Sequence, residues 1–302
     1  MSVTIPLRLA ARAADSRWSG WLDRLPHQLD ELVSEWQLGI DGAAAAGSCS
    51  IVLPVRTRSN DAAALKVSWP HEEAENEHLA LRHWAGDGAV RLLRADPRRF
   101  ALLLERADAG TDLHSVPVPE AIETVASLYP RLHRSAPPQL RRLSALSAEW
   151  SERLPSLSSH GGLPRRIVER AIALARGLSI DPQTDGTLIH GDLHYGNVLA
   201  ALPGSDREPW LAIDPKPLSG DPCFEVWPLL RNRWDELPAH GRRDGLLARL
   251  YLAVDAAGLD EDRVRDWAFV RAVVDVLWQV DDGTIDDLAL DRSVAIAKAV
   301  QR

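Results

Sequence analysis

The sequence predicts an α+β protein of two lobes, with a small β-sheet in residues 1–105 and a mainly helical lobe in residues 106–302. Three observations predict it. Short apolar runs separated by polar turns dominate residues 50–105, whereas apolar residues at helical spacing dominate the rest of the chain after residue 105. The chain has 302 residues, of which 45% are hydrophobic, enough for a substantial core. Small and polar residues at 107–111 mark the boundary between the lobes.

The first lobe is expected to open with two amphipathic helices, because apolar residues recur at helical spacing over 18–25 and, after Pro26, over 29–36. The runs 51–55 and 62–69, split by a polar turn, indicate a β-hairpin. A charged helix is expected over 72–84. A second hairpin is expected from the runs 90–93 and 100–104.

The second lobe is predicted to be helical apart from one interruption. Pro119 and Pro164 stand where the first residue of a helix often is a proline. The interruption consists of short strand-like runs at 187–189, 198–201 and 210–213, and polar residues gather around it. A last helix is expected over 292–302.

Composition limits the classes of partner. A net charge of −8 and a pI near 5.7 argue against nucleic acid as the main ligand and favour a cationic or neutral small molecule. Cys49 and Cys223 show no paired spacing, so we expect no disulfide and a reducing cytoplasm. We find no signal peptide or membrane-spanning run, and expect a cytoplasmic protein without a membrane partner.

The strongest motif is the segment His190-Gly191-Asp192-Leu193-His194-Tyr195-Gly196-Asn197. Its Asp192 and Asn197 have the spacing of the kinase catalytic loop. Phosphoryl transfer needs a carboxylate to align and deprotonate the attacking hydroxyl, and oxygen ligands for Mg²⁺. We assign Asp192 to the first task and Asn197 to the second. Asp214, at the end of the apolar run 210–213, is the second candidate magnesium ligand.

A lysine and an acidic helix precede this motif in kinase order. Lys66 lies in a strand-like run and is a candidate phosphate contact. Glu73 and Glu77, four residues apart, are both candidates for its ion-pair partner, and we favour Glu77. The small-residue turn around Ser48 takes the place of a phosphate-binding loop, although it has neither of the usual glycine patterns.

Together the H-G-D-x-x-x-x-N loop and Ile213-Asp214-Pro215-Lys216 resemble the aminoglycoside phosphotransferase family. The segments Gly47–Arg56, Leu102–Arg106 and Gly220–Glu225 further resemble its streptomycin 6-kinase and hydroxyurea phosphotransferase branch. This likeness implies a bilobal protein-kinase-like fold, ATP and Mg²⁺ as cofactors, and adenine contacts by the backbone of Glu105 to Ala107.

The resemblance also implies transfer of the γ-phosphate of ATP to a hydroxyl of an aminoglycoside such as streptomycin, or a related amino sugar, and thus antibiotic resistance. Hydroxyurea or another small metabolite is the alternative substrate. Four acidic residues could bind a cationic substrate beside the catalytic loop. They are Asp221, Glu225, Asp235 and Glu236.

Other interpretations remain open. His190-x-Asp192-x-His194 could belong to a metal-dependent hydrolase, because histidine and carboxylate ligands suit zinc. A nucleotide-binding pseudokinase would keep the fold without turnover. No long activation segment fits between Asp214 and Glu225, so a small substrate is expected and no protein partner is implied.

Overall fold

The computed structural model describes residues 3–157, 162–284 and 286–301. It divides into two compact units. The first comprises Met1–Ala109 and Ala200–Lys216, and the second comprises Gly110–Leu199 and Pro217–Arg302. The expected single boundary near residue 105 places residues 200–216 in the second lobe, whereas their contacts group them with the first unit.

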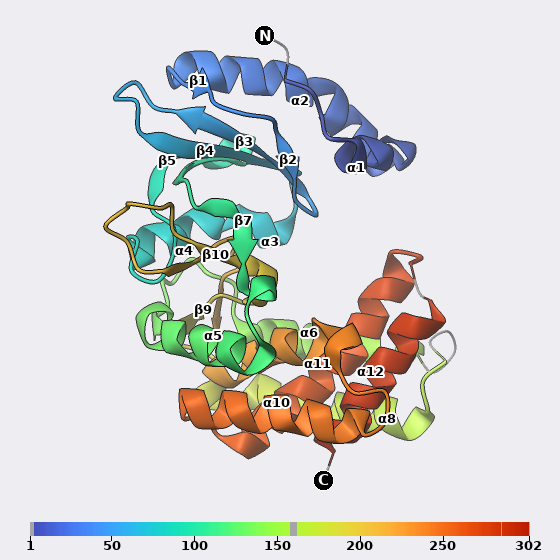
Figure 1. The fold of residues 1–302 in the computed structure, drawn as a ribbon. Coiled ribbons are helices and arrows are strands. Elements are labelled where there is room, and N and C mark those ends of the chain that lie inside the picture. Colours follow the sequence, from blue (N-terminus) through green and yellow to red (C-terminus); the bar gives the residue numbers. More distant parts are fainter. Residues whose placement is uncertain (1–2, 158–161, 285, 302) are drawn as a thin grey trace. The chain divides into compact units, whose positions relative to one another are not determined.

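An antiparallel sheet forms the centre of the first unit (Figure 1). Its described strands are β1 (Gly39–Ile40), β2 (Ala45–Ala46), β3 (Ser50–Arg56), β4 (Ala62–Ser68), β5 (Leu92–Asp96) and β6 (Ala101–Glu105). They follow the order β1-β3-β4-β6-β5, and β2 pairs with β3. The two predicted hairpins are therefore present, but the first strand of the second hairpin begins at Leu92 rather than at residue 90. Its ladder also contains a register shift between Leu92 and Arg94.

The N-terminal segment forms α1 (Leu7–Ala10), a 3-10 turn and the long helix α2 (Ser16–Glu35). Two helices broken at Pro26 were predicted here, but α2 continues through the proline. An interior proline removes one backbone hydrogen bond and costs about 3 kcal/mol. Burial of the apolar face of α2 on both sides of Pro26 offsets that cost, since Leu25 and Leu29 have no exposed surface.

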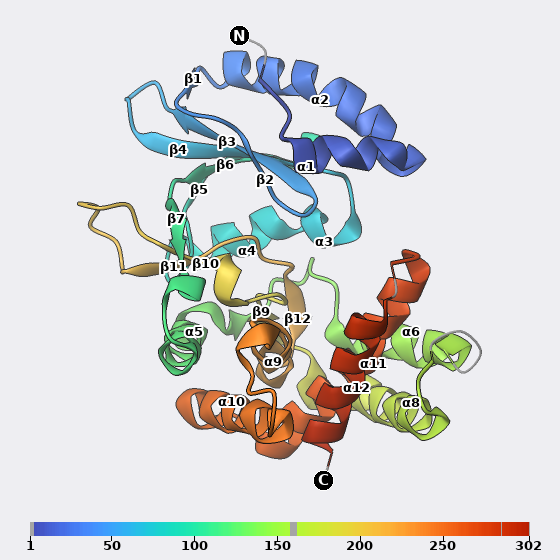
Figure 2. The ribbon, with the colours of Figure 1, turned by 45° about the vertical axis from the view of Figure 1, so that its right-hand side comes forward.

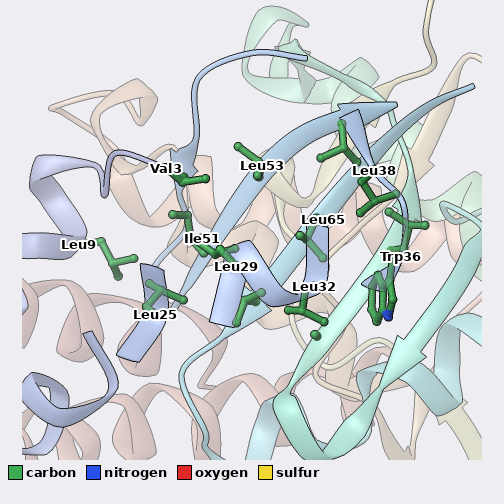
Figure 3. Packing of buried hydrophobic residues seen from close by; sticks show 14 of the residues in the cluster. Val3, Leu9, Leu25, Leu29, Leu32, Trp36, Leu38, Ile51, Leu53 and Leu65 are labelled. Carbon is green, nitrogen blue, oxygen red and sulfur yellow. The ribbon is translucent and has the colours of Figure 1, made fainter. Parts of the chain in front are cut away.

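The core of the first unit lies between α2 and the sheet (Figure 3). Leu25, Leu29 and Leu32 of α2 face the alternating buried side chains of β3 and β4, among them Ile51 and Leu65. The two strands correspond to the apolar runs 51–55 and 62–69 that predicted the hairpin. The opposite face of the sheet carries α3 (Glu72–Glu75) and α4 (Glu77–Trp84) (Figure 2).

Helices make up most of the second unit. They are α5 (Val118–Leu132), α6 (Leu143–Arg153), α8 (Arg165–Ile180), α9 (Trp227–Arg231), α10 (Arg242–Ala257), α11 (Glu261–Asp281) and α12 (Asp287–Val300). The central helix is α11, which packs against α8 and α12. The last helix begins at Asp287, five residues before the predicted start, because the side chain of Asp286 caps it.

A short sheet in the second unit supports the polar loop. Its strands are β8 (Arg134–Ser135), β9 (Thr187–Ile189) and β12 (Leu218–Gly220), with β9 in the middle. The remaining strands are β7 (Asp108–Asp112), β10 (Val198–Ala200) and β11 (Trp210–Ala212). Both cysteines carry free thiols. Among the described helices, none combines the length and the apolar character needed to cross a bilayer.

Candidate active site

The first unit holds a buried ionic cluster of Lys66, Glu77 and Asp214, which we call the lysine centre. Lys66 Nζ lies 2.7 Å from both carboxylate oxygens of Glu77. It also contacts Oδ1 of Asp214. The side chains of Lys66 and Glu77 are only 6% and 2% exposed, whereas that of Asp214 is 47% exposed. The cluster therefore has one carboxylate in the interior and one at its open side.

The helix break at Asn76 determines which glutamate joins the lysine centre. α3 ends at Glu75 and α4 begins at Glu77, and Asn76 between them has a non-helical backbone with φ −107°. Glu73 and Glu77 therefore do not share one continuous helix face. Glu77 pairs with Lys66, while Glu73 lies 3.3 Å from Nζ of Lys216.

Burial and charge act in opposite directions on the lysine centre. Burial favours the neutral amine of Lys66, but the charges and hydrogen bonds of Asp214 and Glu77 outweigh it and raise the pKa of Lys66. Burial raises the pKa of Glu77 to about 7. With all three groups ionised, the cluster carries one net negative charge, so a further cation would stabilise it.

Asp214 occupies a strained backbone position two residues after the end of β11. Its φ of 56° is in the left-handed region, which costs a residue with a Cβ on the order of 1 kcal/mol, although aspartate tolerates it better than most. The chain changes direction at Asp214, before Pro215. One Asp214 oxygen contacts Lys66, and the carboxylate remains partly exposed.

In the second unit, the polar loop begins where β9 ends at Ile189. His190 is fully buried, and its Nδ1 accepts a hydrogen bond of 3.3 Å from the backbone N–H of Asp192. Asn197 Nδ2 donates to the backbone oxygen of Asp192 at 2.9 Å. Because the amide nitrogen is used in this way, the orientation of the Asn197 amide is fixed and its oxygen remains for another ligand.

The histidines of this loop do not form a zinc site. Nδ1 of His190 and Nδ1 of His194 both accept backbone hydrogen bonds, from Asp192 and Gly196 respectively. Within the described ranges, no group of three or more His, Cys, Asp or Glu side chains is arranged to hold a metal ion. These contacts argue against the hydrolase interpretation.

Glu225 is a buried residue that supports the polar loop through a hydrogen bond to Gly191, and it is not a substrate contact. It is 1% exposed, and its Oε1 accepts the backbone N–H of Gly191 at 2.5 Å. His133 Nε2 lies 3.3 Å from the other carboxylate oxygen. Burial opposes ionisation of Glu225, but hydrogen bonds from His133 and Gly191 and the charges of nearby histidines lower its pKa. Its place inside the apolar run 223–227 was a signal of burial.

Asp221 is likewise a structural residue and not a substrate contact. It is 3% exposed, forms an ion pair with Arg263, and accepts from Trp267 Nε1 at 2.7 Å. The other two predicted substrate carboxylates do reach the surface. Asp235 is exposed, and Glu236 is exposed but pairs with Arg233 at 2.6 Å.

The predicted adenine-binding segment is connected to an arginine that the sequence interpretation missed. Arg207 is 4% exposed and pairs with the Glu105 carboxylate. It also donates to the backbone oxygens of Gly86 and Ala89. Arg207 lies in the long loop between β10 and β11, where composition alone indicates only a polar surface loop.

The remaining nucleotide-contact predictions lie in the first unit. Ala107 is buried, two residues after the strand that ends at Glu105. Ser48 is exposed in the turn between β2 and β3, which Gly47 N–H closes with a 2.8 Å hydrogen bond to the Ser50 oxygen. Of the predicted residues, the structure thus brings together Lys66, Glu77 and Asp214 in the first unit, and Asp192 and Asn197 in the second.

Comparison with solved structures supports the fold. A spectinomycin phosphotransferase in complex with ADP and spectinomycin matches with a TM-score of 0.60 at 14% identity, covering 91% of this chain and 97% of that one. A choline/ethanolamine kinase family protein from Mesorhizobium loti matches with a TM-score of 0.58 at 19% identity, covering 90% of this chain and 94% of that one. The fold is therefore the protein-kinase-like fold of aminoglycoside phosphotransferases.

Sequence relatives narrow the family. A streptomycin 6-kinase of Streptomyces glaucescens is 39% identical, covering 99% of this chain and 97% of its own. A hydroxyurea phosphotransferase of Kitasatospora aureofaciens is also 39% identical, covering 93% of this chain and 80% of its own. The model of the aminoglycoside/hydroxyurea antibiotic resistance kinases matches residues 35–283. The chain therefore belongs to this family of phosphotransferases.

Proposed function

We propose that the protein is an ATP- and Mg²⁺-dependent kinase that phosphorylates a hydroxyl of an aminoglycoside of the streptomycin type. The observation that carries this proposal is the lysine centre, in which a buried glutamate fixes a lysine beside a partly exposed aspartate. That arrangement is what phosphoryl transfer requires on the nucleotide side. The streptomycin 6-kinase relatives, aligned over nearly the whole chain, support the substrate class.

The nucleotide contacts would come from the first unit. Lys66, held by Glu77, would donate to phosphate oxygens of ATP. Ser48, in the exposed turn after β2, would face the phosphates, and the backbone of Glu105 to Ala107 would meet adenine. The Arg207 contact would hold this adenine-binding segment in place.

The residues present fit Mg²⁺, which prefers oxygen ligands and keeps some of its waters. The Asn197 amide is oriented by its bond to Asp192 so that its oxygen is the remaining ligand atom. The Asp214 carboxylate is the second ligand, and its partial exposure leaves room for water and phosphate oxygens. Mg²⁺ bound there would neutralise charge on the phosphates.

Asp192 would act on the acceptor. The His190 ring and the Asn197 amide bind the backbone N–H and the backbone oxygen of Asp192, respectively. These two hydrogen bonds fix the backbone from which the carboxylate projects. In that position it would align the substrate hydroxyl and accept its proton as the oxygen attacks phosphorus. Exposed Asp235 and Glu236, together with the net charge of −8, suit a substrate with amino or guanidinium groups.

Hydroxyurea is the second candidate substrate. The hydroxyurea phosphotransferase relative has the same 39% identity as the streptomycin 6-kinase, although the alignment covers less of its length. Hydroxyurea carries an N-hydroxyl group but no cationic group. If substrate binding does not depend on the exposed carboxylates of Asp235 and Glu236, hydroxyurea is therefore favoured.

A coupled ADP-release assay with ATP and Mg²⁺ tests the function. We expect streptomycin to stimulate ADP release, and expect Asp192→Ala to abolish turnover while nucleotide binding persists, because Asp192 acts on the acceptor. Asp244→Asn, an exposed carboxylate at the start of α10, is the matched control and should retain full turnover. Full activity of Asp192→Ala would refute the assignment, and stimulation by hydroxyurea alone would select the second candidate.

A further inference from the structure

Lys216 is a second lysine near the lysine centre, and the proposed mechanism gives it no task. Its Nζ lies 3.3 Å from Glu73, so Glu73 and Glu77 of the acidic stretch each pair with one lysine. Both ion pairs lie in the first unit. The Lys66–Glu77 pair is buried, whereas the side chains of Lys216 and Glu73 are 38% and 50% exposed.

Because of this difference in exposure, the two ion pairs differ in how costly they are to break. A buried pair is expensive to break, because each partner would leave an uncompensated charge in the interior. A half-exposed pair contributes little, since water solvates both partners when they separate. Lys66 is therefore fixed, while Lys216 can exchange Glu73 for a stronger anion without destabilising the fold.

The chain places Lys216 beside the proposed phosphate site. It comes two residues after Asp214, and the buried Pro215 between them has a restricted backbone φ, which limits where Lys216 can lie relative to Asp214. Lys216 also acts electrostatically on the turn of residues 47–50. Burial raises the pKa of the Cys49 thiol in this turn, and the charges of Lys216, Glu73 and Asp214 act on the same thiol.

The nucleotide contacts proposed above assign Lys66 to the phosphates, but assign no side-chain cation specifically to the terminal phosphate. Lys66 is enclosed between Glu77 and Asp214, so its remaining hydrogen-bonding capacity is small. Negative charge on the transferring phosphoryl group needs stabilisation by cations that are positioned in advance. Lys216 has the charge for that role, and its ion pair with Glu73 is half-exposed.

We propose that Lys216 is a phosphate-binding residue that leaves Glu73 and contacts the terminal phosphate of bound ATP. The inference rests on the proposed function and adds one residue to its site. During transfer, the acceptor oxygen bonds to the γ-phosphorus as the bond to the β–γ bridging oxygen breaks, and ADP leaves with that electron pair. The hydroxyl proton passes to Asp192, and Lys216 stays protonated throughout, donating hydrogen bonds to γ-phosphate oxygens.

The test compares two nucleotides that differ by the terminal phosphate. Calorimetric titration of AMP-PNP and ADP, each with Mg²⁺, would be made on the wild type, Lys216→Met and Lys216→Arg. We expect Lys216→Met to weaken AMP-PNP binding at least tenfold and ADP binding less than twofold. Lys216→Arg, which keeps a cation, should recover most of the AMP-PNP affinity. A merely structural role would change both nucleotides equally.

Glu73→Gln provides the matched control, because it releases Lys216 without altering it. AMP-PNP should then bind as tightly as to the wild type or up to about threefold more tightly, since exposed pairs compete weakly. Equal losses of affinity for both nucleotides in Lys216→Met, or no loss for either, would overturn the proposed role of Lys216 but not the proposed function. A wild-type protein that binds neither nucleotide would overturn the proposed function, and this inference with it.

Discussion

Glu225 is a buried carboxylate that positions the proposed catalytic Asp192 without taking part in the chemistry itself. It accepts the N–H of Gly191, the residue directly before Asp192, and Gly191 has a φ of 81° that favours glycine. The hydrogen bond therefore fixes the turn from which the Asp192 carboxylate starts. A side chain expected to bind substrate instead supports the proposed catalytic aspartate from the interior.

Acid should destabilise the protein through Glu225. Its folded pKa lies below the ordinary value of 4.5, so its stabilising contribution is fully present above that value and is lost as the pH falls through the folded pKa. We expect Glu225→Gln to lower the free energy of unfolding at pH 7 by about 1–3 kcal/mol, because a charged acceptor in a buried network is lost.

Urea unfolding of wild type and Glu225→Gln, from pH 7 down through pH 4.5 to values below the folded pKa of Glu225, measures this effect. The difference between the two proteins should shrink toward the acid end, as the wild-type carboxylate becomes protonated. Parallel stability curves at all pH values would show that Glu225 does not carry the acid dependence.

The same residues show what the sequence can and cannot predict about a site. Lys66, Glu77 and Asp214 could be singled out because they follow one another in the order of the kinase motifs. Asp221 and Glu225 were misassigned because charge in a sequence does not reveal burial, and the partners that bury Asp221, Arg263 and Trp267, lie more than forty residues away. Arg207 was missed for a related reason, since its acceptors are mostly backbone oxygens.

At the scale of elements, a close contact between β9 and β12 supports the polar loop. β9 leads into His190, and β12 leads into the segment that ends with Glu225, so their pairing sets the distance over which Glu225 reaches Gly191. Gly220 of β12 lies opposite Thr187. A Cβ at Gly220 would meet Cδ1 of the Ile189 side chain at 2.5 Å and its Cγ1 at 2.9 Å, so the Ile189 side chain would have to shift.

Gly220→Ala should therefore destabilise the protein by about 1–3 kcal/mol, the usual cost of overpacking a core. The matched control is Gly177→Ala, an exposed site inside α8 where a Cβ meets no atom within 4 Å. That substitution should stabilise by up to about 1 kcal/mol, because alanine favours the helix. Denaturant midpoints measure both, and a neutral Gly220→Ala would contradict the close-contact argument.

Helices and strands could be predicted where the local sequence pattern determines them. The β3–β4 hairpin was predictable because two short apolar runs flank a polar turn in the sequence, and the two strands form there. The break expected at Pro26 was wrong because a local rule about proline was outweighed by tertiary packing, since Leu25 and Leu29 on either side are fully buried.

At the scale of the whole molecule, the chain crosses between the two units more than once. The sequence indicates one change of texture near residue 105 and so predicts one crossing. Residues 200–216 return to the first unit, where Arg207 contacts Glu105 and Asp214 contacts Lys66. These are contacts between segments separated by more than a hundred residues, which no local pattern encodes.

This arrangement gives the proposed magnesium ligands to both units, Asp214 to the first and Asn197 to the second. Mg²⁺ with ATP should then stabilise the protein beyond ATP alone, and a well-saturated ligand should raise the Tm by on the order of 5 °C. Asn197→Ala should remove most of the magnesium-dependent part of the shift and retain the part seen with ATP and EDTA, which depends on the first unit.

Asn232→Ala is the matched control for this measurement, because Asn232 also donates its amide nitrogen to a backbone oxygen, that of Pro228 at 2.8 Å, but has no proposed metal role. It should keep the full magnesium-dependent shift. If Asn197→Ala also keeps the full shift in thermal unfolding, its amide oxygen does not bind the metal. The hydrogen bond to Asp192 would then be the whole function of Asn197, and the metal would depend on Asp214 and the phosphates.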